Sequence, residues 1–295
     1  MSRCRSVCLS VFVVLIGWAT VAVPASAQHF QQIPGSLTQV AVGRTEVWGL
    51  NASNQTYRFI PGGKKFARIL QSLTQIAVGG GTVGQADEVW GLSASGLIYR
   101  FDFHTLKFAQ VPGTLAQIAV GEGDEDNCHP YEVWGFNSVL QVYRYNYCTS
   151  QFDQLSGSPP LTHIATDGGN VWGLDEFAQI WQYNFSTGGF DSAPGSLQQI
   201  TVGVNDVWGL DGSGGVWRYD PGTAQFFQYS PVVLAQIKAG GNGVWGIDSS
   251  DQIYRFDNGQ FFPRLPGSLV QIAVGSGGGV WGINSSHQVY EWVRP

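Results

Sequence analysis

The tripeptide Val-Trp-Gly occurs seven times in this chain of 295 residues. Consecutive copies lie 36 to 44 residues apart. Their tryptophans are Trp48, Trp90, Trp134, Trp172, Trp208, Trp245 and Trp281. Chance does not place one aromatic tripeptide at so regular an interval, so the chain is built from seven copies of one unit. Such a period is typical of solenoids and propellers, whose units bury their faces against one another.

Three further segments recur in step with this tripeptide. Leu-x-Gln-Ile-Ala-Val-Gly precedes it, first at residues 37–43, and an aromatic-Arg-aromatic segment follows it, first at residues 57–59. A segment that begins with Phe comes last, as at Phe66. All are short, rich in β-branched and aromatic residues, and bounded by Gly, Pro, Asn, Asp or Ser, which indicates strands and turns. Four strands per repeat make one propeller blade.

The two ends of the repeat array predict how the ring closes. The Leu-x-Gln-Ile segment is the least aromatic, and we assign it as the innermost strand. Val-Trp-Gly then forms the second strand, aromatic-Arg-aromatic the third, and the Phe segment the outermost. Residues 30–33 form an outer strand, and residues 288–292 form a third strand. We therefore predict an all-β fold, a single seven-bladed β-propeller with four antiparallel strands per blade, whose N-terminal strand completes the last blade and leaves no free edge.

The N-terminal segment has the features of an export signal. Arg3 and Arg5 precede an apolar stretch over residues 7–23, and Ala-Ser-Ala follows at residues 25–27. This pattern predicts a signal peptide over residues 1–27 and a propeller domain over residues 28–295. An uncleaved anchor is the alternative, against which the polar residues after Ala27 argue. No later apolar segment is long enough to span a bilayer. We expect a protein that is secreted to the extracellular space or periplasm.

Two cysteines remain after the signal peptide, and both fall in the third repeat. In an exported protein, Cys128 and Cys148 indicate a disulfide. The predicted strand order places both on one face, where the bond would pin the expanded loop at residues 121–132. The loop at residues 79–88 is also expanded. Two cysteines without a matching His/Cys set make a poor zinc site, so no metal is expected there.

Composition and motifs argue against several functional classes. The formal net charge is −6 and basic residues form no cluster, so a nucleic acid partner is not expected. The sequence has no G-x-S-x-G or H-E-x-x-H motif, and its histidines occupy unrelated repeat positions, so we expect no enzyme. Glu122, Asp124, Glu125 and Asp126 could attract calcium, but they lack an EF-hand pattern and are interpreted as solvated charge. No cofactor is expected.

Two repeated side chains have competing interpretations. The Trp of Val-Trp-Gly either packs in the core, with the Gly leaving room for an aromatic ring, or stacks on a sugar; we favour the core. The Arg of the third strand can donate to sugar hydroxyls or phosphate. It can equally bond turn carbonyls or stack on an aromatic ring of the neighbouring blade. Both interpretations stay open for Arg58, Arg100, Arg144, Arg218 and Arg255.

Two sets of polar residues also recur. A Gln in each inner strand but one, as at Gln39, is expected to form hydrogen bonds around the channel. An Asn or Asp begins the hairpin between the second and third strands in six repeats, where such residues start turns by bonding their own backbone. The same side chains could form the rim of a pocket. These candidates are Asn51, Asn137, Asp175, Asp211, Asp248 and Asn284.

Taken in order, Pro-Gly-Ser-Leu-x-Gln-Ile-Ala-Val-Gly, Val-Trp-Gly-Leu-Asn/Asp and Ile-Tyr-Arg-Phe resemble the tectonin repeat. Tectonin-type proteins include slime-mould and fungal tectonins, horseshoe-crab lipopolysaccharide-binding lectins and fish-egg lectins. The resemblance covers residues 30–292, with departures at Gln182 and Glu291, where the Arg is replaced. It implies a β-propeller lectin that binds glycans or lipopolysaccharide on cell surfaces.

Two classes of function follow from this interpretation. The first is a secreted, multivalent lectin whose pockets between blades are copied around the ring, so that weak sites add avidity. The alternative is a non-catalytic scaffold that binds another protein, because propellers serve both purposes. A lyase or hydrolase acting at the central channel is a third, less favoured possibility. The expanded loops at 79–88 and 121–132 break the symmetry and could form a separate partner site.

Overall fold

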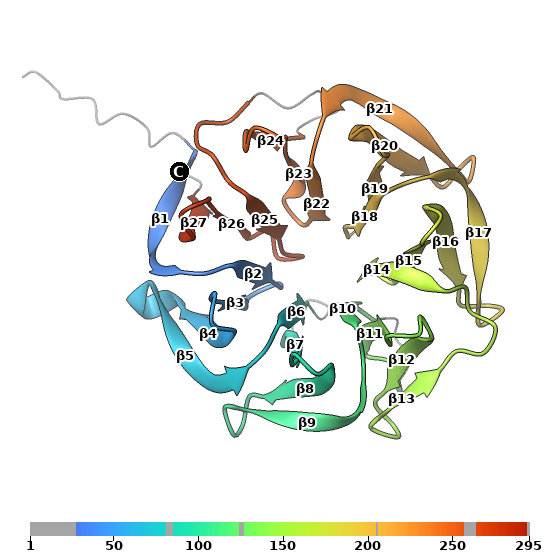
Figure 1. Ribbon diagram of the computed structural model, residues 1–295, viewed down its shortest axis with the longest axis horizontal. Helices are drawn as coiled ribbons and strands as arrows, with labels where there is room; N and C mark the ends of the chain where they lie inside the picture. The colour runs from blue at the N-terminus through green and yellow to red at the C-terminus, as the bar shows by residue number, and fades with distance from the viewer. Residues whose placement is uncertain (1–27, 81–84, 124–126, 205, 257–263, 294–295) are drawn as a thin grey trace, which may run out of the picture.

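The computed structural model describes residues 28–80, 85–123, 127–204, 206–256 and 264–293. Seven sheets stand around a central axis like the blades of a propeller (Figure 1). Every strand pair within a sheet is antiparallel. Each pair joins strands that are consecutive in sequence, except for β1 and β27, which close the ring. A short 3-10 turn at Pro61–Gly63 interrupts one hairpin.

The innermost strands carry the Leu-x-Gln-Ile segment. They are β2 (Gln39–Val42), β6 (Gln75–Gly79), β10 (Gln117–Glu122), β14 (Leu161–Asp167), β18 (Gln199–Val202), β22 (Gln236–Gly240) and β25 (Gln271–Val274). The second strands carry Val-Trp-Gly. They are β3 (Val47–Leu50), β7 (Glu88–Leu92), β11 (Tyr131–Phe136), β15 (Asn170–Asp175), β19 (Val207–Leu210), β23 (Gly243–Ile247) and β26 (Val280–Ile283).

The third strands carry the aromatic-Arg-aromatic segment. They are β4 (Gln55–Ile60), β8 (Leu97–Asp102), β12 (Val142–Asn146), β16 (Gln179–Asn184), β20 (Gly215–Asp220), β24 (Ile253–Arg255) and β27 (Gln288–Val293). The outer strands contain the recurring Phe. They are β5 (Lys65–Ser72), β9 (Lys107–Thr114), β13 (Gln151–Gln154), β17 (Gly189–Ser196), β21 (Gln225–Val233) and β1 (His29–Ser36). We number the blades 1 to 7 from β2–β5 onward, so that blade 6 is β22–β24 and blade 7 is β25–β27 with β1.

The predicted strand order and blade number are confirmed. Blade 6 has three strands and one isolated bridge, between Ile253 and Leu265, within the described residues. The Phe segment predicted for this blade, at Phe261 or Phe262, lies outside them.

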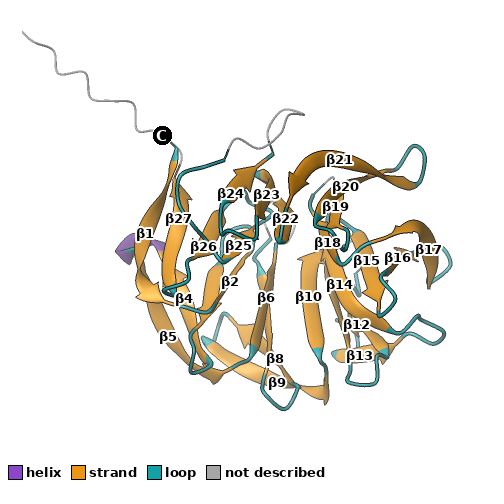
Figure 2. Cartoon of the chain, turned by 45° about the horizontal axis from the view of Figure 1, so that its top comes forward, coloured by secondary structure: helices purple, strands orange, loops and turns teal. Residues whose placement is uncertain are grey.

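Ring closure also follows the prediction. β1 pairs with β27 at the opposite end of the chain, with Phe30 facing Trp292 and Ile33 facing Val289 across the ladder. Figures 1 and 2 show β1 completing the sheet formed by β25, β26 and β27. The first and last segments of the fold are therefore held in one blade by backbone hydrogen bonds.

The core consists of seven similar clusters, one between each pair of adjacent blades. The seven Val-Trp-Gly tryptophans are at most 2% exposed. Each contacts an aromatic ring of the next blade; Trp48 meets Phe101 edge-on, for example, with ring centroids 4.6 Å apart. The interpretation of these tryptophans as core residues is confirmed, because their rings have no surface with which to stack on a ligand.

The Gly of Val-Trp-Gly has a different role from the one expected. A Cβ added at Gly49 would lie 2.4 Å from the Leu37 side chain and 2.8 Å from the Gln39 carbonyl oxygen. The six equivalent glycines face the corresponding Leu in the same way, at 2.3–2.6 Å. Gly therefore leaves room for the buried Leu two residues before the inner-strand Gln or His, and the prediction that it accommodates an aromatic ring is wrong.

The inner-strand Gln residues link neighbouring blades. Gln39 Nε2 donates to the Ile76 carbonyl at 3.2 Å, and its Oε1 accepts from the Ile76 N–H at 3.3 Å. Gln271 makes the same pair of bonds to Val40 across the junction between blades 7 and 1. Hydrogen bonding around the channel is thus confirmed.

Candidate functional site

The propeller presents two different faces. Because the strands of each blade alternate in direction, the second-to-third hairpins and the connections between blades lie on one face, which we call the hairpin face. The remaining turns, including those that carry Cys128 and Cys148, lie on the other, which we call the disulfide face. Backbone hydrogen bonds such as Leu73 N–H to the Asn54 carbonyl join each connection to a hairpin on the hairpin face.

The predicted Asn residues organise both a turn and an aromatic side chain on the hairpin face. Asn51 Oδ1 accepts the backbone N–H groups of Ser53 and Gln55, at 3.0 and 2.9 Å, so the turn interpretation is confirmed. Its Nδ2 donates to Gln55 Oε1 at 2.9 Å and approaches Tyr57 Oη at 3.4 Å. Asn137 and Asn284 repeat this arrangement with the Tyr six residues on.

The predicted Asp residues make the same turn with a different partner. Oδ2 of Asp175 accepts the indole N–H of Trp181 at 3.1 Å, and that of Asp211 accepts the indole of Trp217 at 2.7 Å. Asp248 accepts the hydroxyl of Tyr254 at 2.9 Å. Hydrogen bonds from the Ser213 hydroxyl, then from the Trp217 indole and the Gly215 backbone N–H, lower the pKa of Asp211 to about 2. Its carboxylate is therefore charged at neutral pH. Both Asn and Asp therefore fix the orientation of a third-strand aromatic ring.

These aromatic rings were not among the predicted site residues. They are half-buried and pack against the core cluster that their blade shares with the preceding blade. The set is Tyr57, Tyr99, Tyr143, Trp181, Trp217, Tyr254 and Tyr290. The sequence signal was present, because the residue six positions after each hairpin Asn or Asp is always Tyr or Trp. Together with the hairpin Asn or Asp, each ring forms what we call an Asx–aromatic unit.

One Asx–aromatic unit, that of blade 7, lines a pocket that extends from the hairpin face along β1 and β27. The pocket lies between blades 6 and 7 and has a volume of about 410 Å³. Asn284 and Tyr290 line it together with His29, Phe30 and the connection at residues 266–268. A second cleft of about 780 Å³ lies near the channel mouth over blades 1 to 3, lined largely by hydroxyl and amide side chains, including Thr38, Thr74 and Ser95.

Four of the five predicted Arg residues form ion pairs toward the disulfide face. Arg58 donates Nε and Nη2 to the two carboxylate oxygens of Glu46, at 2.7 and 2.6 Å. These hydrogen bonds raise the pKa of Arg58. Arg100 with Glu88 and Arg144 with Glu132 have the same two-pronged geometry, and Arg218 contacts Asp206.

The same guanidinium groups also stack on aromatic rings. Arg58 lies 5.3 Å from the ring centre of Phe103, and Arg100 lies 5.0 Å from that of Tyr147, both in the next blade. These contacts support the structural interpretation of the Arg residues. Their assignment to ligand binding stays a prediction, in which a ligand would compete with the carboxylate already bound.

The acidic partners were missed, although the repeats contain a signal for them. Each acid stands two residues before the Trp, as at Glu46, Glu88, Glu132 and Asp206. Where the Arg is replaced by Gln182 or Glu291, this position holds Asn170 or Gly279. Arg255, whose repeat has Gly there, bonds Gln28 and Asn242 instead. Comparing the seven copies column by column would have paired the two positions.

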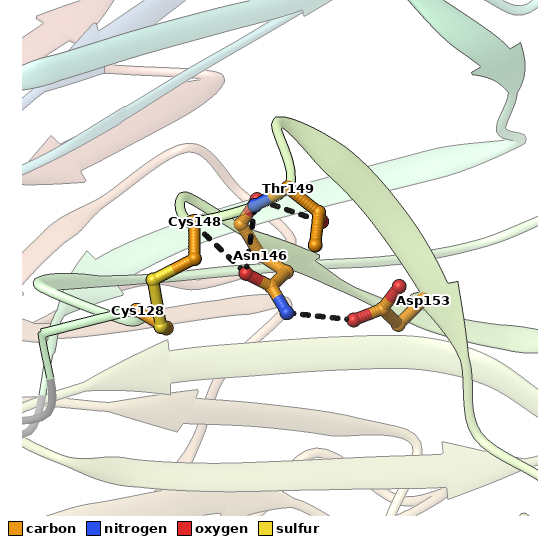
Figure 3. Close-up of a disulfide and its surroundings, with 5 residues drawn as sticks. All are labelled: Cys128, Asn146, Cys148, Thr149 and Asp153. Carbon is orange, nitrogen blue, oxygen red and sulfur yellow. Dashed lines mark hydrogen bonds between the residues drawn. A yellow bond between two sulfur atoms is a disulfide. The ribbon is translucent and has the colours of Figure 1, made fainter.

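The disulfide between Cys128 and Cys148 is present, with a Cα–Cα distance of 5.0 Å (Figure 3). Asn146 supports it, because its Oδ1 accepts the Cys148 N–H and its Nδ2 donates to Asp153. The bond ties the expanded loop at 121–132 to the turn after the third strand, as predicted from the shared face.

The expanded loop at 79–88 has a structural contact of its own. Asp87 is 2% exposed, and its carboxylate accepts the backbone N–H groups of Arg44, Thr45 and Glu46 in blade 1. This carboxylate therefore fastens the loops of blades 1 and 2 together. A partner site on the two expanded loops stays a prediction.

Other predictions fall partly outside the described residues. The signal peptide at 1–27 and the acidic residues Asp124, Glu125 and Asp126 lie there. In the described part of the chain, no three His, Cys, Asp or Glu side chains are grouped so that they could hold a metal ion. A search of the same residues found no helix with the length and apolar character needed to cross a membrane.

The central channel contains one departure from the Gln pattern. His163 replaces Gln in β14, and its Nε2 lies 3.3 Å from the Ile200 carbonyl, so it keeps the link to the next blade. Burial, followed by the charge of Lys238, lowers the pKa of His163 to about 4. The imidazole is therefore neutral at physiological pH.

We predict that His163→Gln makes the protein more stable in mild acid. The pKa of His163 is about 6.5 in the unfolded chain and about 4 in the folded chain. Between these pH values the folded chain holds fewer protons on His163 than the unfolded chain, so the stability falls as the pH drops from about 6.5 to 4. At pH 5 the substitution should raise the free energy of unfolding by up to about 2 kcal/mol, with a smaller effect at pH 8. Urea unfolding at both pH values measures this, with exposed His104→Gln as the control; equal shifts at both pH values would contradict the prediction.

Comparison with known proteins is informative for the family and the fold. The family model described as the Tectonin domain matches residues 12–184 and 160–295. A search of curated proteins by sequence found no match. Among solved structures, "YCF48 bound to D1 peptide" aligns over 91% of this chain and 95% of its own, with a TM-score of 0.64 and 11% identity.

Two further solved structures are similar to this chain to the same degree. YCF48 from Cyanidioschyzon merolae covers 89% of this chain and 98% of its own, with a TM-score of 0.63 and 12% identity. Human WBSCR16 covers 88% and 87%, with a TM-score of 0.65 and 12% identity. At this level of identity the likeness to these structures shows the propeller fold alone.

Proposed function

The chain belongs to the tectonin domain family, and from this premise we propose that it is a secreted, multivalent lectin that binds cell-surface glycans or lipopolysaccharide without catalysing a reaction. The observation that carries the proposal is the Asx–aromatic unit, repeated between blades on the hairpin face. Six of the seven repeats contain it, and in the remaining one Ser93 replaces the Asn or Asp beside Tyr99.

The chemistry of this unit suits a sugar. A pyranose ring has apolar C–H faces, which pack on aromatic rings, and hydroxyl groups, which need donors and acceptors nearby. Tyr290 offers a half-buried ring beside the amide of Asn284 and the hydroxyl of Ser268 in the pocket between blades 6 and 7. Asn284 Nδ2 donates to Tyr290 Oη at 3.3 Å, which helps to orient the ring before a ligand arrives and so reduces the entropy lost on binding.

The ring arrangement favours repeated ligands. Weak sites on one face of a rigid disc bind a surface with many glycans by avidity, without any new contact. The disulfide between Cys128 and Cys148 is compatible with an oxidising compartment, which supports the proposal that the protein acts outside the cytoplasm.

We predict that Tyr290→Ala weakens glycan binding at the pocket between blades 6 and 7 roughly tenfold, whereas Tyr290→Phe keeps binding at this pocket within about threefold. A lost stacking contact of about 1–1.5 kcal/mol corresponds to roughly a tenfold change in affinity, and Phe keeps the ring. A glycan array, which includes purified lipopolysaccharide, identifies the ligand, and calorimetry with its soluble form measures the two variants. Arg58→Lys, on the opposite face, serves as the control.

The outcomes of this experiment separate the candidate roles of the two faces. If Arg58→Lys weakens binding while Tyr290→Ala does not, the ligand binds at the Arg positions and the hairpin-face site is wrong. Equal loss in all variants with an unchanged melting temperature would also count against a site at Tyr290.

A protein-binding scaffold is the second candidate function. One protein of similar fold is described as "YCF48 bound to D1 peptide", so a propeller of this shape can bind a peptide. Here Val139 and Phe177, at the hairpin tips of blades 3 and 4, are 69% and 79% exposed, whereas the equivalent positions elsewhere are Ser. No binding on the array, together with a protein recovered by the native chain but not by Phe177→Ser, would favour this function.

A further inference from the structure

The central channel contains one lysine that the repeat pattern does not require. The inner strands contribute a small residue two positions after the Gln or His, which is Ala in five blades and Thr201 in blade 5. In blade 6 this position is Lys238, which lines the channel. The channel has a volume of about 310 Å³, and at the position equivalent to Lys238 the other blades contribute short side chains such as Ala41 and Ala273.

Lys238 has no hydrogen-bond or ion-pair partner among the described residues. An ammonium group removed from bulk water without a partner is costly, so proteins pair it, neutralise it or supply a counter-ion. Burial lowers the pKa of Lys238, and no acidic side chain of the described chain opposes this effect.

The acidic group that also lines the channel is already engaged. Asp167 Oδ1 accepts the backbone N–H groups of Glu122 at 3.4 Å and Gly168 at 3.0 Å. Burial raises the pKa of Asp167 to about 6, and Lys238 is not among the charges that act on it. Asp167 therefore does not serve as the counter-ion of Lys238.

Several neutral donors also line the channel without a partner. Gln75 uses its Oε1 to accept the Ile118 N–H, while its Nε2 makes no bond to the described residues. The hydroxyls of Thr166 and Ser276 are buried and lack a partner in the described part of the chain. Hydroxyl and amide hydrogens of this kind solvate an anion, directly or through water.

We propose that the central channel binds a small monovalent inorganic anion, of the size of chloride, with Lys238 as its counter-charge. One lysine supplies one positive charge, which favours a monovalent ion over phosphate or sulfate. The ring of alanines leaves space for the ion and its remaining water. An anion held here would cross-link the inner strands of several blades and so stabilise the ring, independently of glycan binding.

The experiment uses bromide as the probe, because its anomalous scattering distinguishes it from water. Crystals of the whole propeller grown or soaked in sodium bromide are expected to show a bromide within hydrogen-bond distance of Lys238 Nζ. Lys238→Ala, which restores the residue found in five blades, should lose this peak, while exposed Lys107→Ala should keep it. A channel without bromide beside Lys238, or an unchanged peak in Lys238→Ala, would overturn the proposal.

A solution measurement tests the same site independently of the crystal. At constant ionic strength, replacing gluconate by bromide should raise the melting temperature of the native protein by about 2 °C or more. Lys238→Ala should lose this rise, and Lys107→Ala should retain it. An equal rise in all three proteins would instead indicate a general salt effect, and no rise in any would indicate a neutral lysine; either result contradicts the proposal.

Discussion

A chain that lacks residues 28–36 is expected to be unfolded or aggregated at room temperature. These residues include all of β1, which supplies the outer strand of blade 7. Their loss removes Ile33, which is 1% exposed, and Phe30, which packs edge-on against Trp292 and Trp245 at 5.0 and 5.9 Å. Deleting large buried apolar side chains costs about 2–5 kcal/mol each, and a domain of this kind has about 5–15 kcal/mol of stability in total.

The deletion also opens the ring. β27 would present an unpaired edge, which is a template for association with another chain. Loss of the near-ultraviolet circular dichroism and elution as large species would be the observed results. A truncated chain that elutes as a monomer, with the urea midpoint of the full propeller, would show that β1 does not close the ring.

A circular permutant provides the matched control for this deletion. His29 pairs directly with Val293, so a hairpin turn of about three to five residues can join the end of β27 to the start of β1. A chain that begins at Leu37 and ends with this hairpin and β1 contains the same strands in the same positions. It should recover the circular dichroism spectrum and most of the stability, because the ladder does not depend on where the chain begins.

This closure was predictable from the sequence, as was the rest of the blade architecture. Every repeat has the same strand order, and the array of strands starts with an outer strand and ends with a third strand. Only the first strand can therefore complete the last blade. Each strand was also marked by turn residues of known chemistry, such as Asn51 at the hairpin of blade 1. The fold is therefore encoded by local signals that recur in register.

The side-chain partners were less predictable, for physical reasons. Arg58 and Glu46 lie twelve residues apart and meet only because β3 and β4 pair in one register, which a motif on either strand does not reveal. Gly49 was assigned to the wrong neighbour because Leu37 reaches it from the connection that precedes β2. Lys238 is visible in the sequence as the one departure from a small residue at its repeat position, but the pattern does not show that it lines the channel without a partner among the described residues.

The Arg–acid pairs should differ in energetic value according to their burial. The Glu132 side chain is 0% exposed and that of Arg144 is 13% exposed, whereas Asp206 and Arg218 are 39% and 34% exposed. Trp134 also donates its indole N–H to Glu132, so this carboxylate has two buried partners. Removing one member of a buried pair leaves the other charge without compensation, whereas an exposed pair contributes little.

We therefore predict that Glu132→Ala lowers the free energy of unfolding by about 3–5 kcal/mol, and that Asp206→Ala lowers it by less than about 1 kcal/mol. Urea unfolding followed by tryptophan fluorescence measures both changes. The two substitutions occupy equivalent repeat positions, so the difference reports the burial and hydrogen bonding of the carboxylate rather than its place in the repeat. Similar losses for both would refute a dependence on burial.

A double substitution separates the charge from the packing. In Glu132→Ala with Arg144→Met, the second change removes the guanidinium that the first leaves uncompensated, while its chain still covers Trp134. The double variant should be more stable than Glu132→Ala alone, with a coupling of about 2 kcal/mol or more. If the two losses simply add, Glu132 stabilises the fold independently of Arg144, and the ion pair is then not the structural role of this Arg. The same measurement therefore tests whether this Arg is structural or belongs to a binding site.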